Sequence, residues 1–100
     1  MKSGYEIVWS DHALNELTQT LEYLEQNFTE KELKKLSKEI KKSVNLISIN
    51  PFIFSDSEIR NVRKVIIARY NTLYYRIKGK DIEIISFFSN RQNPAKRKIN

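Results

Sequence analysis

The fold is decided by residues 11–49, which read DHALNELTQTLEYLEQNFTEKELKKLSKEIKKSVNLISI. In the first half of this stretch, large apolar residues recur three or four positions apart. They are Leu14, Leu17, Leu21, Leu24 and Phe28. This period places them on one face of an amphipathic helix, and Ser10 and Asp11 supply oxygens that can cap its N-terminus.

A second helix follows almost without a linker. Thr29 and Glu32 form a T-x-x-E capping box, in which the two side chains take up backbone N–H groups of the first turn. The apolar stripe of this helix is Leu33, Leu36, Ile40, Val44 and Ile47. Asn50-Pro51 ends it, because proline disfavours the helical conformation of the residue before it. Residues 11–49 are therefore predicted to form an antiparallel helical hairpin.

Strand-like patterns lie on both sides of the hairpin. Residues 5–9, YEIVW, put Tyr5, Ile7 and Trp9 on one face by their two-residue repeat. Three further runs follow the hairpin: Val62–Arg69, Leu73–Ile77 and Ile82–Phe88. The predicted fold class is α+β, in the order β-α-α-β-β-β, with the N-terminal strand and the helical hairpin packed on one face of a small, mainly antiparallel sheet. Residues 1–100 are predicted to form one domain, because a chain of this length buries a single core.

Gly79-Lys80 suits a two-residue hairpin turn, which fixes the register of the last two strands. On the face that packs against the helices, the predicted pairs are Ile77 with Ile82, Tyr75 with Ile84, and Leu73 with Ser86. On the opposite face, which no helix covers, they are Arg76 with Glu83, Tyr74 with Ile85, and Thr72 with Phe87. The second face is predicted to be free to meet a partner.

The charge of the chain is concentrated in its second half. Lys and Arg number 18 against 12 Asp and Glu, a formal net charge of +6. Residues 1–50 hold seven Lys, no Arg and eight acidic residues, whereas residues 51–100 hold eleven basic and four acidic residues. All six arginines lie in the second half: Arg60, Arg63, Arg69, Arg76, Arg91 and Arg97. Such asymmetry favours a polyanion or an acidic protein as partner, although a merely solvated basic surface is the alternative.

Composition excludes several classes of protein. The absence of Cys rules out a disulfide framework, a zinc ribbon and a thiol nucleophile. No Gly-rich phosphate loop, H-E-x-x-H or G-x-S-x-G motif is present, so neither a metal nor a cofactor is expected. No apolar run approaches the roughly 20 residues of a membrane span, and a cytoplasmic protein is expected.

Candidate catalytic residues come from the basic half of the chain. With one His and no Cys, catalysis would have to rest on Arg, Lys, Tyr, Glu or Asp. The candidates are Lys64, Arg63, Arg69 and Arg91, since Arg and Lys can bind phosphates and stabilise the charge that builds during phosphodiester cleavage. The alternative is that these cations are solvated or paired with carboxylates.

Candidate binding residues lie on the predicted open face and in the tail: Tyr74, Arg76, Phe87 and Arg91. The predicted register places Tyr74 on the open face, where its ring could stack on a base or contact a protein. Tyr75 is predicted to lie in the core, and Arg76 to pair with Glu83.

The chain resembles the RelE/ParE family of bacterial toxins from type II toxin–antitoxin systems. The similarity begins with YEIVWS at residues 5–10, followed by Ala13 and Glu16-Leu17, and continues through the hairpin to Asn50-Pro51. It is strongest over residues 62–85 and extends into the tail. The matching runs there are Val62-Arg63-Lys64, Arg69-Tyr70, Leu73–Ile77, Ile82–Ile85 and Phe87–Pro94.

This resemblance implies a growth-inhibiting toxin of a plasmid-stabilisation or stress module, neutralised by a cognate antitoxin that wraps across the helices and sheet. Members similar to RelE cut messenger RNA on the ribosome with Arg, Lys and Tyr groups, whereas members similar to ParE inhibit DNA gyrase. Lys64 and Arg91 match basic positions of the RelE-like pattern, but Asn71 stands where those nucleases carry Arg. The Tyr that those nucleases use near the C-terminus is also missing, because no Tyr follows Tyr75. A ParE-like action on gyrase is therefore expected, with a ribosome-dependent endoribonuclease as the alternative.

Overall fold

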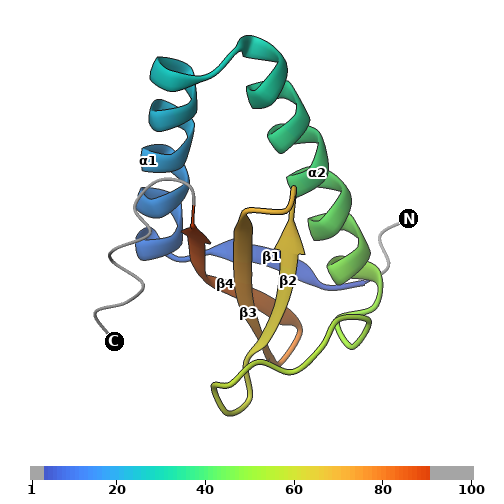
Figure 1. Ribbon diagram of the computed structural model, residues 1–100. Helices are drawn as coiled ribbons and strands as arrows, with labels where there is room; N and C mark the ends of the chain where they lie inside the picture. The colour runs from blue at the N-terminus through green and yellow to red at the C-terminus, as the bar shows by residue number, and fades with distance from the viewer. Residues whose placement is uncertain (1–3, 91–100) are drawn as a thin grey trace.

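The computed structural model describes residues 4–90. Its elements follow the predicted order: β1 (Glu6–Trp9), α1 (Asp11–Asn27), α2 (Glu30–Ile49), β2 (Arg63–Ile67), β3 (Asn71–Lys78) and β4 (Asp81–Ser89). Figure 1 shows α1 and α2 side by side as a hairpin above the sheet. The predicted α+β class and the single-sided helical layer are confirmed.

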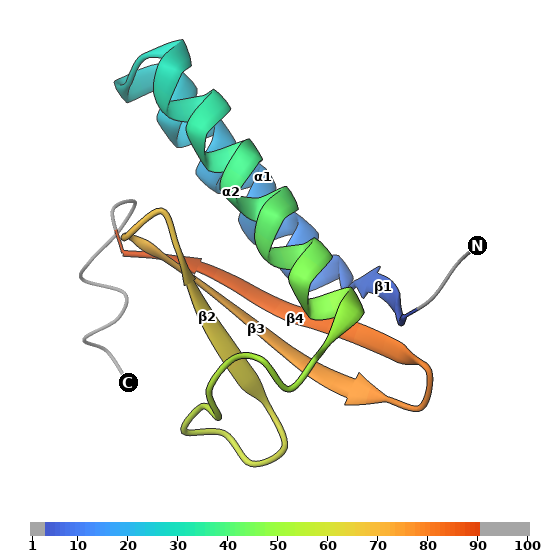
Figure 2. The same ribbon diagram turned by 90° about the vertical axis from the view of Figure 1, so that its right-hand side faces the viewer.

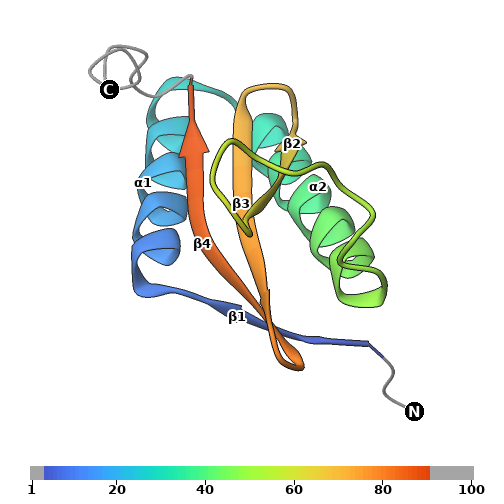
Figure 3. The same cartoon turned by 90° about the horizontal axis from the view of Figure 1, so that it is seen from below.

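The four strands form one sheet in the order β1-β4-β3-β2. β1 pairs with β4 in parallel, and the other two ladders are antiparallel. Figures 2 and 3 show that both helices cover the same face. Neither helix covers the opposite face, which only the loop between α2 and β2 crosses in the described part of the chain, and we call it the open face. No helix among residues 4–90 has both the length and the apolar character that crossing a membrane requires.

The first helix begins as predicted. Ser10 is its N-cap, and its Oγ accepts a hydrogen bond from the Ala13 N–H at 3.0 Å. The buried side of α1 is rotated from the predicted stripe, because Ala13, Thr20 and Leu24 are buried whereas Leu14 and Phe28 are substantially exposed.

The second helix starts at the predicted place without the predicted capping box. Thr29 is the N-cap of α2, but its side chain makes no capping hydrogen bond. The Glu32 N–H donates instead to the Thr29 carbonyl oxygen at 3.0 Å. The predicted stripe of α2 is largely confirmed, since Leu36, Ile40 and Ile47 are buried.

The core lies between the hairpin and the sheet. Tyr75 is fully buried, as predicted, and its hydroxyl donates to the Pro51 carbonyl oxygen at 2.8 Å. This bond ties the turn after α2 to the middle of β3. The other members of the core come from both layers, and the sheet contributes Val65, Ile67, Leu73, Ile82, Ile84 and Phe87.

The predicted β3–β4 register is right near the turn and wrong beyond it. Ile77 pairs with Ile82, Arg76 with Glu83, and Tyr75 with Ile84. Between Tyr74 and Tyr75 the register shifts by one residue. The pairs beyond the shift are Tyr74 with Ser86, Leu73 with Phe87, Thr72 with Phe88, and Asn71 with Ser89. β4 carries the extra residue, and a bulge of this kind exchanges the faces of all side chains that follow it.

Candidate functional site

The open face carries one cluster built from predicted site residues. Lys64 on β2 lies opposite Tyr74 on β3, and the side chains of both reach Glu58 in the loop between α2 and β2. Lys64 Nζ lies 3.5 Å from Glu58 Oε1, and the Tyr74 hydroxyl donates to Glu58 Oε2 at 3.3 Å. The backbone N–H of Glu58 itself, followed by Lys64 and Tyr74, holds the pKa of this carboxyl below its usual value. A negative charge is therefore already stabilised at this place.

Arg63 faces away from this cluster, because neighbouring residues of a strand point to opposite faces. Its guanidinium lies over the Phe52 ring at 5.1 Å from the centroid, and Nη1 donates to the Phe54 carbonyl oxygen at 2.6 Å. Nη2 lies 3.6 Å from Asp56 Oδ1. These contacts fasten the α2–β2 loop to the sheet, which is a structural role.

Arg69 lies at the other end of β2. It belongs to the turn that joins β2 to β3, where Ala68 and Arg69 both have positive φ angles, 50° and 72°. The turn borders a cavity of about 220 Å³ under the hairpin, which Arg69 lines together with Lys35 and Glu32. Two successive non-glycine residues in the left-handed region store strain, which the surrounding contacts must hold.

The three catalytic candidates that the structure describes are thus dispersed. Lys64 lies on the open face, Arg63 binds the loop on the other side of the strand, and Arg69 lies at the far end of β2. Arg91 lies outside the described residues.

The structure describes three of the four predicted binding residues, Tyr74, Arg76 and Phe87. Arg76 pairs with Glu83 as predicted, with both Nε and Nη2 at 2.7 Å from Oε1. Tyr74 is half-buried on the open face. Phe87 was expected on that face, but its side chain is 1% exposed in the core, because the bulge turns it toward the helices. Its placement as an exposed binding residue was therefore wrong.

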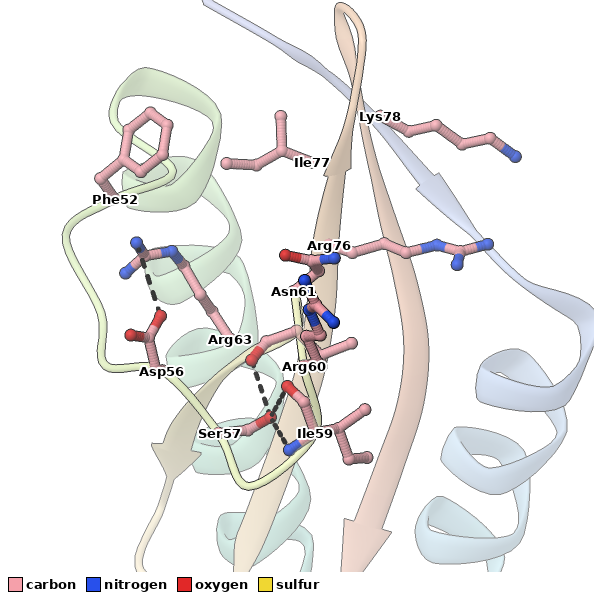
Figure 4. Close-up of a pocket in the computed structure, with 11 residues that line it drawn as sticks. Phe52, Asp56, Ser57, Ile59, Arg60, Asn61, Arg63, Arg76, Ile77 and Lys78 are labelled. Atoms are coloured by element: carbon pink, nitrogen blue, oxygen red, sulfur yellow. Dashed lines mark hydrogen bonds and ion pairs between the residues drawn. The ribbon is translucent and has the colours of Figure 1, made fainter.

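Sequence reasoning missed the contribution of the α2–β2 loop, which it treated only as a connection. The loop borders an open pocket of about 820 Å³ at the end of β3, shown in Figure 4. Phe52 and Ile59 from the loop are 60% and 49% exposed. Four cations and one carboxylate line the same pocket: Arg60, Arg63, Arg76, Lys78 and Asp56. The available signal was the unusual density of large apolar residues in a loop, four between Phe52 and Ile59.

Known proteins share this architecture. In the ParDE toxin–antitoxin system of P. aeruginosa, a chain matches with a TM-score of 0.72 and 20% identity, over 85% of this chain and 95% of that one. The YoeB dimer of Staphylococcus aureus gives a TM-score of 0.59 with 21% identity, over 84% of this chain and 94% of that one. A YoeB/ParE toxin from Agrobacterium tumefaciens gives a TM-score of 0.59 with 13% identity, over 84% of this chain and 96% of that one.

Sequence comparisons bear on the family directly. A search of curated proteins finds no match. The family model described as "ParE toxin of type II toxin-antitoxin system, parDE" matches residues 7–94, which include both helices and all four strands except Glu6, the first residue of β1. The chain therefore belongs to the ParE toxin family of type II toxin–antitoxin systems.

Proposed function

We propose that the chain arrests growth by a ParE-like action on DNA gyrase, and that it does so as a single cytoplasmic domain without chemistry of its own. The observation that carries this proposal is the dispersal of the basic side chains. The side chains of Lys64 and Arg63 lie on opposite faces of β2. Each forms an ion pair with a carboxylate of the α2–β2 loop, Lys64 with Glu58 and Arg63 with Asp56. Arg69 lies at the other end of the strand. Cleavage of a phosphodiester needs its acid, base and charge-stabilising groups within reach of one phosphate.

Neutralisation by a cognate antitoxin follows from membership of the family. We propose that the antitoxin contacts the open face at Tyr74 and Arg76 and also engages Arg91 in the tail. A half-buried aromatic beside a basic side chain is a common anchor in protein interfaces, which supports this choice.

A second candidate function is ribosome-dependent cleavage of messenger RNA. The observation that favours it is the cluster of Lys64, Tyr74 and Glu58, in which a cation, a hydroxyl and a carboxylate meet on an accessible surface. Displacement of Glu58 by a phosphate would leave Lys64 and Tyr74 as donors to it.

The experiment that separates the two is induction of the chain alone in bacteria. Gyrase poisoning predicts double-strand DNA breaks and an SOS response with intact messages. Cuts in messenger RNA at a fixed position within codons, lost in Arg91→Ala or Lys64→Ala, would support the nuclease instead. Growth that continues on induction would contradict both.

A further inference from the structure

The outward side of α2 is a continuous row of lysines. Six of the seven lysines in residues 1–50 belong to this helix, and all six are exposed: Lys31, Lys34, Lys35, Lys38, Lys41 and Lys42. At about 100° per residue they fall within about 120° of the helix circumference. The buried Leu36, Ile40 and Ile47 lie on the opposite side of the helix. We call this row the lysine face of α2.

The positive charge of the lysine face is not neutralised within residues 4–90. None of its six ammonium groups forms an ion pair with a carboxylate of that part of the chain. Glu32 and Glu39, which belong to the same segment, are half-buried and lie to one side of the face. Figure 2 shows α2 in front of α1, with none of the labelled strands or helices over its outward side. The face is therefore accessible to a partner of opposite charge.

The lysine face weakens the helix that carries it. Side chains three or four positions apart are neighbours on a helix, and like charges at these spacings repel each other. The face holds these pairs of that kind: Lys31–Lys34, Lys31–Lys35, Lys34–Lys38, Lys35–Lys38, Lys38–Lys41 and Lys38–Lys42. The helix dipole favours cations in the last turn of α2, yet that turn has no basic residue. A bound polyanion would relieve the repulsion that the helix does not relieve itself.

The side chains of the face select among polyanions. None of the exposed large hydrophobic residues lies between residues 31 and 42, so a membrane or a protein partner would find no apolar anchor there. The segment also holds no aromatic residue on which the bases of a single strand could stack. Lysine donates to phosphate oxygens and has no acceptor with which to read a base or a 2′-hydroxyl. This composition favours the phosphate backbone of a duplex.

The dimensions of the face also fit a duplex. From Lys31 to Lys42 the face extends about 16 Å along the helix axis, whereas duplex DNA carries one negative charge per roughly 1.7 Å of its own axis. Several phosphates can therefore meet several lysines at once. A second copy of the chain fits less well, because beyond its first turn α1 offers only Glu22 and Glu25 as exposed carboxylates.

We propose that the lysine face of α2 binds the phosphate backbone of duplex DNA without reading its sequence. The choice of DNA over duplex RNA rests on the proposed function, because DNA is the substrate of gyrase. The contact holds the chain on the DNA that gyrase engages. The open face lies on the other side of the sheet from α2 and stays available to a protein.

The test measures binding of a fluorescein-labelled DNA duplex to the full chain by fluorescence anisotropy at several concentrations of KCl. The test variant replaces three lysines in the middle of the face: Lys31→Gln, Lys38→Gln and Lys42→Gln. It is expected to bind about tenfold or more weakly at about 0.1 M KCl, and to make the slope of log K against log [KCl] shallower by about 2–3. The control removes the same charge from exposed positions of the α2–β2 loop and the end of the β3–β4 hairpin: Arg60→Gln, Lys78→Gln and Lys80→Gln. Its slope is expected to change by less than about 1.

A second variant and a second measurement separate binding from folding. The triple variant with arginine at the three face positions keeps the charge, and it is expected to bind the duplex as the unchanged chain does. Thermal unfolding followed by circular dichroism shows whether each variant folds. The glutamine variant of the face is expected to melt no lower than the unchanged chain, because it loses repulsion between like charges.

Equal losses in the face variant and in the control would overturn the assignment to α2. Tighter binding of an RNA duplex of the same length would overturn the choice of DNA. Stronger competition by polyglutamate than by unlabelled DNA would instead identify an acidic protein as the partner. Self-association without DNA, abolished in the face variant, would identify a second copy of the chain.

The binding measurement contains no gyrase, so the two proposals fail separately. A chain that binds duplex DNA through α2 and leaves gyrase unaffected would contradict the proposed function alone. A chain that inhibits gyrase and does not bind the duplex would contradict the role of the lysine face alone.

Discussion

Glu16 on α1 accepts a hydrogen bond at 2.8 Å from the backbone N–H of Phe87 on β4, across 71 positions of sequence. The same carboxylate oxygen accepts the Ser86 hydroxyl at 2.7 Å. Both donors lie just past the extra residue of β4, where the ladder with β3 shifts. The helix thus binds the strand at its bulge and holds the register that directs Phe87 into the core.

Removal of this carboxylate should destabilise the protein. Glu16→Ala leaves the Phe87 N–H without its acceptor and is expected to lower the free energy of unfolding by about 1–3 kcal/mol. Urea unfolding followed by circular dichroism measures it. Glu22→Ala, an exposed position of the same helix, should stay within about 0.5 kcal/mol of the unchanged chain. Equal losses in the two variants would show that the bond to Phe87 contributes nothing specific.

Tyr75 should make stability sensitive to high pH. Burial raises the pKa of its hydroxyl above the ordinary value of 10.0, against an opposing effect of Arg63. The unfolded chain therefore loses this proton at a lower pH than the folded one. The contribution of the Tyr75 hydroxyl to the free energy of unfolding is complete below the pKa that this group has in the unfolded chain. It falls as the pH rises through that value toward the pKa in the folded protein. The stability difference between the unchanged chain and Tyr75→Phe should shrink over this window in urea titrations, and a constant difference would contradict the assignment.

Loss of the hydroxyl also has an effect at neutral pH. Tyr75→Phe leaves the Pro51 carbonyl oxygen without its donor, and the free energy of unfolding is expected to fall by about 1–2 kcal/mol. A variant as stable as the unchanged chain would show that water replaces this bond without cost.

Arg63 should act on the loop and not on chemistry. Arg63→Ala removes the donor to the Phe54 carbonyl and the cation over Phe52, and it is expected to lower the free energy of unfolding by about 1–3 kcal/mol. Limited proteolysis should cut residues 52–62 faster in this variant than in Arg60→Ala, whose side chain is exposed. Unchanged proteolysis together with lost toxicity would favour a direct functional role of Arg63.

Tyr74 should matter for the partner more than for the fold. Tyr74→Ala is expected to weaken the complex with the cognate antitoxin by about 1–2 kcal/mol in isothermal titration calorimetry, as truncation of an interface aromatic commonly does. Tyr74→Phe keeps the ring and loses only the bond to Glu58, so its affinity should fall less. Loss of the cooperative thermal transition in Tyr74→Ala would place this side chain in the core and contradict its role on the open face.

Local patterns were sufficient to predict the elements and their order. The apolar periods of the two helices, the cap at Ser10 and the turn at Gly79 each act within a few residues, and all three appear in the structure. Gly79 has a φ of +64°, which a glycine adopts without strain. The pairs nearest that turn were predicted correctly for the same reason.

What sequence did not predict depends on contacts between distant segments. The bulge in β4 is held by a hydrogen bond from Ser86 to Glu16, 70 residues away in the sequence. No local sequence pattern near Ser86 predicts it. The prediction therefore continued the original register and placed Phe87 on the wrong face. The ion pairs of Arg63 with Asp56 and of Lys64 with Glu58 were missed for a different reason. They join residues close in sequence, but they form only because the loop folds back along β2.

The most direct test of the central claim is the supercoiling activity of purified DNA gyrase in the presence of the purified chain. A ParE-like action predicts that supercoiling of relaxed plasmid falls as the chain is added, that gyrase–DNA cleavage complexes accumulate, and that equimolar antitoxin reverses both effects. Gyrase that works unhindered at any ratio, together with messenger RNA cut in ribosomes supplied with the same preparation, would contradict the account.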